Sequence, residues 1–141
     1  MTRPLVVDAS ALIAVLLDPS DAAGQVGALL ASRPLHAPAI LPVEVANVLR
    51  RHRAAGIVDP SEAAAAHLLM VRLPVEYWPY EVLADRVWAL TGALTAYDAA
   101  YVALAELIGA TLVTADRRLA RAPGLRCDVL TVRVAEDPPT A

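Results

Sequence analysis

Two residue types are missing from this sequence, and a third occurs only once. There is no lysine, so all twelve basic residues are arginine, and mechanisms that need a catalytic or phosphate-binding lysine are excluded. There is no phenylalanine, and the single cysteine, Cys127, cannot form an internal disulfide. No segment approaches the roughly 18 consecutive apolar residues that a membrane span needs. We therefore expect a cytoplasmic protein that does not insert into a membrane.

The sequence as a whole is strongly apolar. Hydrophobic residues make up 57% of the 141 residues and charged residues 19%, which is typical of a globular chain of one domain. The apolar share exceeds the usual ~45–50%, and such an excess often means that a partner covers part of the surface. The net charge of −3 provides no global positive field to hold nucleic acid nonspecifically.

Short apolar segments alternate with helical patterns along the chain. The pattern predicts strands at 5–7, 35–37, 74–78, 111–114 and 129–134. It predicts helices at about 9–17, 21–32, 42–55, 61–73, 80–90, 97–108 and 116–121. This alternation indicates an α/β domain with a parallel sheet covered on both faces, over residues 1–134, followed by a tail at 135–141. Ligands bind such sheets outside the carboxyl ends of the strands.

Two acidic residues follow predicted strands directly. Asp8 comes after the first strand, and Asp116 comes two residues after the strand that ends at Thr114. Both are therefore expected at the carboxyl edge, where ligands bind. Each also precedes a predicted helix, so the alternative role of a helix N-cap remains open for both.

Two further acidic residues do not fit their helices. Glu44 lies between Leu41 and Val48 on the apolar side of its predicted helix, where a carboxylate is costly unless it is paired or bound to a cation. Asp98 stands in the first turn of a helix with almost no polar face. Glu44 could instead extend to solvent from the edge of the apolar stripe, and Asp98 could stabilise the helix N-terminus.

Carboxylates that converge at one edge of a sheet repel each other and take up protons unless a cation compensates. A hard divalent ion such as Mg²⁺ or Mn²⁺ suits an all-oxygen site and can promote displacement at a phosphoryl group. Strand ends alone predict convergence only for Asp8 and Asp116.

The four carboxylates stand in the segments VVDASAL at 6–12, PVEVANVL at 42–49, TAYDAAYVALA at 95–105 and LVTAD at 112–116. In order, spacing and total length, these segments resemble the acidic motifs of PIN-domain ribonucleases. More narrowly, they resemble the VapC toxins of bacterial toxin–antitoxin pairs. The resemblance covers about residues 4 to 134.

The resemblance implies a PIN-like three-layer α/β/α domain with a short, mainly parallel central sheet. It implies that Asp8, Glu44, Asp98 and Asp116 gather around Mg²⁺ or Mn²⁺ as catalytic metal ligands that hydrolyse RNA. Ser10 and Thr114 match polar positions that support the site in the family. The resemblance also implies a small VapB-type antitoxin as partner, and a homodimer.

Arginines flank the acidic positions. Arg51 lies two turns beyond Glu44, and Arg117 adjoins Asp116, so both are candidates for contacts with the RNA backbone. The alternative is that they belong to solvated helix faces. The histidines His36, His52 and His67 show no metal-ligand spacing, and we expect ordinary structural roles for them.

Other functions fit the sequence less well. Phosphate-transfer receivers and haloacid-dehalogenase-like phosphatases also use an aspartate after the first strand, but they normally need a lysine. A dinucleotide-binding domain would need a glycine-rich loop after that strand. The remaining alternative is a catalytically silent PIN-like module that pairs with a regulatory partner, and the complete set of four carboxylates argues against it.

Overall fold

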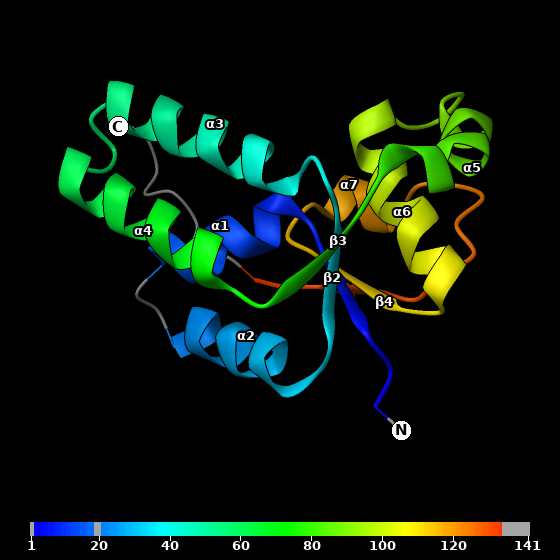
Figure 1. Ribbon diagram of the computed structural model, residues 1–141, viewed down its shortest axis with the longest axis horizontal. Helices are drawn as coiled ribbons and strands as arrows, with labels where there is room; N and C mark the ends of the chain where they lie inside the picture. The colour runs from blue at the N-terminus through cyan, green and yellow to red at the C-terminus, as the bar shows by residue number, and fades with distance from the viewer. Residues whose placement is uncertain (1, 19–20, 134–141) are drawn as a thin grey trace.

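The computed structural model describes residues 2–18 and 21–133, so the tail expected at 135–141 lies outside the described residues. Five strands form one sheet in the order β3-β2-β1-β4-β5 (Figure 1). They are β1 (Leu5–Val7), β2 (Leu35–Pro38), β3 (Val75–Trp78), β4 (Thr111–Thr114) and β5 (Val129–Thr131). All four pairings between neighbouring strands are parallel.

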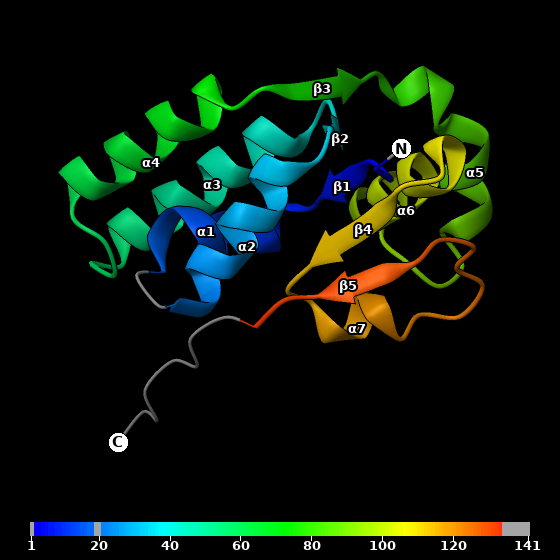
Figure 2. The same cartoon turned by 90° about the horizontal axis from the view of Figure 1, so that it is seen from below.

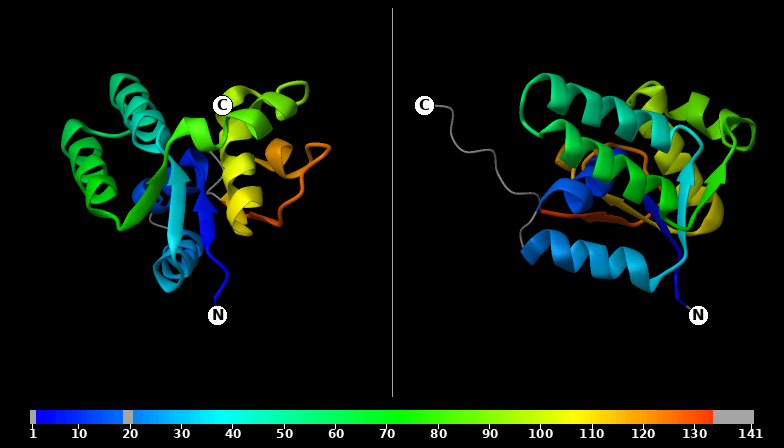
Figure 3. Two further views of the ribbon diagram at one scale, coloured as in Figure 1. Left: turned by 45° about the vertical axis from the view of Figure 1, so that its right-hand side comes forward. Right: turned by 60° about the vertical axis from the view of Figure 1, so that its left-hand side comes forward.

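Helices cover the sheet on both sides. One side carries α1 (Ala9–Leu17), α2 (Asp21–Ser32), α3 (Leu41–Ala54) and α4 (Pro60–Arg72), and the other carries α5 (Ala84–Leu90), α6 (Ala96–Ile108) and α7 (Arg117–Ala120) (Figure 3). A short 3₁₀ turn, η1 (Tyr80–Val82), precedes α5. This arrangement confirms the predicted three-layer α/β/α class.

The central strand explains where a crevice can form. The three residues of β1 are completely buried, as expected for a strand with helices on both faces. After β1 the chain continues to β2 on one side, and it later returns to β4 on the other (Figure 2). Such a reversal of strand order opens a crevice at the carboxyl ends of the two strands that flank it. The ends of β1 and β4 therefore mark the place for a site.

The helix that most directly supports this edge is α6. It packs against β1, β2 and β4, and its buried face includes every residue from Ala99 to Ala105. Thr95 caps its N-terminus by accepting a hydrogen bond from the backbone N–H of Asp98, at 3.2 Å. Its C-terminus ends at Gly109, whose φ of 65° is the left-handed conformation that glycine adopts most readily.

Two predicted elements differ from the structure by more than one residue at a bound. The single helix expected at 80–90 is divided into η1 and α5, because the buried positions Leu83, Val87 and Leu90 begin only after the turn, while Tyr80 and Val82 are exposed. The strand expected at 129–134 ends at Thr131, because its partner strand β4 also ends there, with Thr114 opposite Thr131.

Polar contacts join the helices on the α6 side. Glu106 of α6 accepts hydrogen bonds from the Arg86 side chain at 2.6 Å and from the backbone N–H of Arg126 at 2.7 Å. Arg86 also donates to the carbonyl of Gly124. These contacts hold α5 and the segment before β5 against α6. Within residues 2–18 and 21–133, no helix has the length and apolar character needed to cross a bilayer.

Two leucines of α6 offer a matched test of this packing. Leu104 is completely buried, whereas Leu107 is 56% exposed. We expect Leu104→Ala to lower the free energy of unfolding by about 2–5 kcal/mol, because it removes buried methyl groups and leaves a cavity. We expect Leu107→Ala to change it by less than about 0.5 kcal/mol. Urea denaturation measures both, and equal losses would contradict the described orientation of α6.

Candidate active site

A pocket of about 480 Å³ opens beyond the carboxyl ends of β1 and β4. Its wall is built by residues from separate parts of the chain, among them all four carboxylates singled out from the sequence: Asp8, Glu44, Asp98 and Asp116. Asp8 joins β1 to α1, Glu44 lies on α3, Asp98 lies on α6, and Asp116 precedes α7. The fold therefore brings to one pocket residues up to 108 positions apart in the sequence.

Asp8 is the most deeply placed of the four, with 6% of its surface exposed. Its Oδ1 accepts hydrogen bonds from the Ser10 hydroxyl at 2.7 Å and from the backbone N–H of Ala11 at 3.0 Å, and its Oδ2 accepts one from the Thr114 hydroxyl. Burial raises the pKa of Asp8, and these three hydrogen bonds oppose that rise. Asp8 thus caps α1 and lines the pocket at the same time, so the two roles proposed from the sequence are compatible.

The hydroxyls of Ser10 and Thr114 also connect the two loops of the site. Ser10 Oγ accepts a hydrogen bond from the backbone N–H of Ala115 at 2.9 Å, and Thr114 Oγ1 accepts one from that of Asp116 at 3.0 Å. The same two oxygens donate to Asp8. Movement of either loop would break these bonds, so the positions of Asp8 and Asp116 are coupled.

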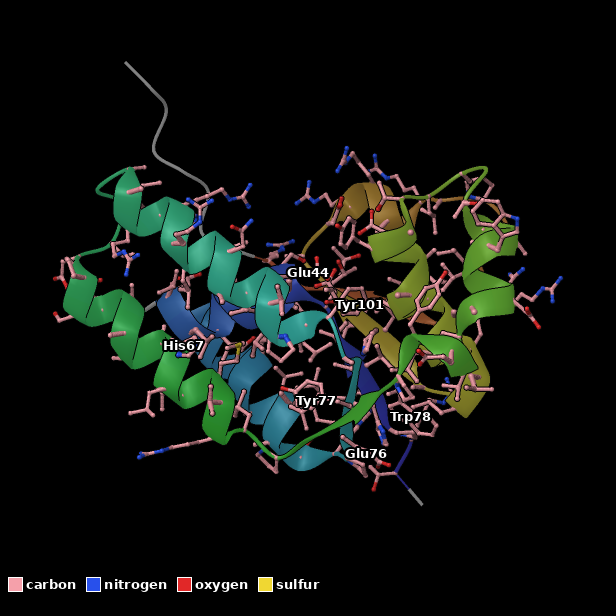
Figure 4. The ribbon with its side chains drawn as sticks, turned by 45° about the horizontal axis from the view of Figure 1, so that its top comes forward. Glu44, His67, Glu76, Tyr77, Trp78 and Tyr101 are labelled. Atoms are coloured by element: carbon pink, nitrogen blue, oxygen red, sulfur yellow. The ribbon has the colours of Figure 1, made fainter. Side chains whose placement is uncertain are left out.

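Glu44 lies on α3 and is paired across the pocket with a tyrosine of α6. The Tyr101 hydroxyl donates to Glu44 Oε1 at 2.7 Å (Figure 4). Burial raises the pKa of Glu44, the hydrogen bond from Tyr101 lowers it, and the charges of Asp98 and Asp8 raise it further. Burial also raises the pKa of Tyr101, so the phenol remains a hydrogen-bond donor.

Tyr101 was not among the residues that the sequence singled out. The signal that could have identified it is its spacing. Tyr101 lies three residues after Asp98, so the two share one face of the helix, and a buried tyrosine hydroxyl usually needs a partner.

Asp98 is partly buried in the first turn of α6. Burial raises its pKa, and the negative charge of Asp116 raises it further. The charge of Asp98 in turn raises the pKa values of Asp8 and Glu44. The four carboxylates therefore influence each other electrostatically, with Asp98 interacting with the other three.

Asp116 differs from the other three because a cation accompanies it. Burial acts to raise its pKa, but hydrogen bonds from Arg118 and the charge of that side chain hold the pKa below its usual range. The backbone N–H of Arg118 donates to Oδ1 at 2.9 Å, and its guanidinium lies 3.3 Å from Oδ2. The partner of Asp116 is thus Arg118, whereas Arg117 is exposed and lies outside the set of described residues that line the pocket.

The pocket extends beyond the carboxylates along α3. Val48 and His52 follow Glu44 at intervals of four residues and also line it, together with Ile13 of α1. Arg51 is exposed and, among the described residues, is not part of the lining. Sequence reasoning assigned His52 an ordinary structural role. Its spacing of eight residues from Glu44 is the signal that places both on one helix face.

The donor set suits a hard divalent cation. Carboxylate and hydroxyl oxygens dominate the polar lining, and the described lining residues include no arginine to neutralise Asp8, Glu44 and Asp98. In the described part of the chain, no three acidic, histidine or cysteine side chains lie close enough to form a ready-made metal cluster. Asp116 is ion-paired with Arg118 instead.

Comparisons with known proteins agree with this geometry. Residues 5–125 match the PIN domain family. The chain is 38% identical over 128 residues to a VapC ribonuclease of Mycobacterium bovis, covering 91% of this chain and 98% of that protein.

Two solved structures have the same fold. A protein from Pyrobaculum aerophilum superposes with a TM-score of 0.65 at 28% identity, covering 90% of this chain and 83% of that one. The VapBC2 structure from Rickettsia felis, bound to a DNA fragment from its promoter, superposes with a TM-score of 0.63 at 14% identity. It covers 92% of this chain and 99% of that one.

Two carboxylates of the pocket should respond oppositely when their charge is removed. We expect Asp98→Asn to raise the melting temperature in chelator by a few degrees, because burial and the charge of Asp116 disfavour the ionised group in the folded state. We expect Asp116→Asn to lower it, because Arg118 loses its partner. Thermal unfolding followed by circular dichroism measures both.

With Mn²⁺ added, we expect the parent protein to have a higher melting temperature than Asp98→Asn. A ligand that binds only the folded state stabilises it, so the parent protein should gain more than Asp98→Asn. If Asp98→Asn melted at a lower temperature than the parent in chelator, this would contradict the unfavourable burial and charge repulsion described for Asp98.

Proposed function

The chain belongs to the PIN domain family, among relatives that are VapC ribonucleases, and on this premise we propose that it is a metal-dependent endoribonuclease. In this proposal it is the toxin of a toxin–antitoxin pair and hydrolyses phosphodiester bonds of RNA in the cytoplasm. The observation that carries the proposal is the single pocket lined by four carboxylates from four separate segments of the chain. One buried carboxylate, Asp8, and three partly buried ones in a single pocket are costly to the folded protein unless a cation compensates their charge.

We assign Asp8, Glu44, Asp98 and Asp116 as the catalytic residues that hold Mg²⁺ or Mn²⁺. When bound, such an ion activates water and stabilises charge on the phosphoryl group during in-line displacement.

Asp8 is the most firmly oriented of the four, because the Ser10 hydroxyl hydrogen-bonds to its Oδ1 and the Thr114 hydroxyl to its Oδ2. Tyr101 fixes one oxygen of Glu44 and leaves the other available. Ser10, Thr114 and Tyr101 are positioning residues in this account.

RNA would approach a pocket whose own charge is negative, so cations at its rim are needed to hold the phosphate backbone. Arg51 and Arg117 are exposed and follow Glu44 and Asp116 in the sequence, and we propose that both contact the RNA backbone. Arg118 is exposed and bonded to Asp116, so its guanidinium could also bind a phosphate of RNA held at the pocket.

The surface also supports protein partners. Three large apolar side chains of α4 are 49% to 61% exposed: Leu68, Leu69 and Val71. On α5, Trp88 is 77% exposed. This is the excess apolar surface that the composition predicted. We propose that a VapB-type antitoxin and a second copy of the chain cover it, as suits the VapC relatives. The Rickettsia neighbour is itself a VapBC pair, but at 14% identity its likeness concerns the fold alone.

A catalytically silent binding module would not require charged groups in the pocket. All four carboxylates are present and line one pocket, as a metal-dependent enzyme would require. The VapC relatives are named as ribonucleases, which favours the enzyme.

A cleavage assay tests the proposed function. Purified chain, free of antitoxin, should cut RNA in Mg²⁺ or Mn²⁺ and should stop when chelator is added. Asp8→Asn and Asp98→Asn should each reduce the rate by about a hundredfold or more, because each removes a proposed metal ligand. Gel electrophoresis of end-labelled RNA measures the rate.

Asp85→Asn is the matched control, because Asp85 is exposed on α5 and lies outside the described lining of the pocket. Its rate should equal that of the parent. If the Asp8 and Asp98 variants also cut at the parent's rate, the activity belongs to a contaminating nuclease. Full activity in chelator would contradict the metal mechanism alone.

The proposed backbone contacts can be tested through salt dependence. Arg51→Ala and Arg117→Ala should each weaken RNA binding and reduce the slope of log affinity against log salt by about 0.7, the value for one contact with a single strand. Arg72→Ala is the control, because Arg72 is an exposed arginine at the far end of α4. Equal slopes for all three variants and the parent would remove Arg51 and Arg117 from the RNA interface.

A further inference from the structure

His52 lies in the wall of the carboxylate pocket, eight residues after Glu44 on α3. Glu44, Val48 and His52 share one face of α3 and line the same pocket. Eight residues along a helix correspond to about 12 Å. Ligands of one divalent ion lie within about 2.6 Å of it, so His52 and Glu44 cannot serve the same ion. The pocket thus has a second end, which the proposed metal chemistry does not use.

Val48, one turn before His52 on α3, adds an apolar side chain to the pocket wall, and Ile13 of α1 adds another. Arg51 and Arg53 are exposed neighbours of His52 in the last turn of α3. Those cations favour a negatively charged ligand near this end of the helix. A polyanionic strand that enters the carboxylate end of the pocket is the ligand that suits both ends.

The imidazole of His52 has an unused hydrogen-bonding group. Its Nδ1 is buried and has no hydrogen-bond partner among the described residues. The backbone of His52 is held firmly, because its carbonyl accepts from the N–H of Ile57 at 2.9 Å and from that of Val58. A buried ring nitrogen without a partner is unfavourable, and few such groups occur in folded proteins. Rotation of the ring toward a ligand in the pocket would satisfy it.

We propose that His52 hydrogen-bonds to a backbone phosphate of the bound RNA, at a phosphate other than the one that is cut. This inference rests on the proposed ribonuclease function and adds a substrate-positioning residue to it. Contact at a second point on the strand aligns the scissile phosphate with the carboxylates. His52 therefore governs substrate binding and not the chemical step.

Binding and kinetics of His52 variants test the inference. In the cleavage-impaired Asp8→Asn protein, His52→Ala should weaken binding of a fluorescein-labelled, unstructured RNA oligonucleotide about tenfold, the loss expected for one hydrogen bond to a charged group. In the otherwise unaltered chain, His52→Ala should raise KM about tenfold for the RNA that the parent cuts, with little change in kcat. His52→Arg should retain binding, because arginine also donates to phosphate.

His67→Ala is the matched control, because His67 is exposed on α4, apart from Glu44 and Tyr101 (Figure 4). It should bind and cut as the parent does. Parental binding and KM in His52→Ala would overturn the inference while the ribonuclease function stands. A lower kcat and melting temperature with unchanged KM would assign His52 a structural role and overturn it too. A parent chain that neither binds nor cuts RNA would remove both proposals.

Discussion

Repulsion between carboxylates at one edge of the sheet opposes the arrangement that the fold imposes there. The fold places Asp8, Glu44 and Asp98 where burial raises the pKa of each, and where the charges of the group raise these values further. Asp116 forms an ion pair with Arg118, whose side chain is largely exposed, and the charge of Arg118 also lowers the pKa of Asp98. Such a pocket is costly to the folded protein unless a cation occupies it. Groups with perturbed pKa values cluster at functional sites, so this destabilisation of the folded state indicates that the pocket is functional.

The surrounding structure holds this unfavourable arrangement in place. Because the strand order reverses at β1, the loops after β1 and β4 lie side by side, and the hydroxyls of Ser10 and Thr114 bond to both loops. On the opposite wall, the hydroxyl of Tyr101 fixes Glu44 across the gap between α3 and α6. Short, buried hydrogen bonds of this kind orient charged groups before a ligand arrives.

The positions of the four carboxylates could be predicted from the sequence, because each prediction used a local signal. Strand ends indicated the positions of Asp8 and Asp116, and misfit with an apolar helix face singled out Glu44 and Asp98. The sequence did not reveal contacts that depend on how separate elements approach one another. The pairing of Tyr101 with Glu44 spans 57 positions, and the unpaired nitrogen of His52 becomes evident only in the folded chain.

The bounds of most helices and strands were also predictable from local signals. The predicted bounds were wrong where tertiary contacts decide where an element ends. The division of the segment 80–90 depends on which side chains α5 buries, and the end of β5 depends on where β4 ends. The hydrogen bonds between Asp116 and Arg118 were not predicted from the sequence, because they depend on the capping geometry of α7.

We infer that the four carboxylates bind metal at a single site. Crystals soaked in Mn²⁺ and measured at the manganese absorption edge would locate this metal. We expect an anomalous peak in the pocket, within ligand distance of Asp8 and Asp98 and bordered by Glu44 and Asp116. A well-ordered pocket with no peak, or manganese bound only elsewhere on the chain, would contradict it.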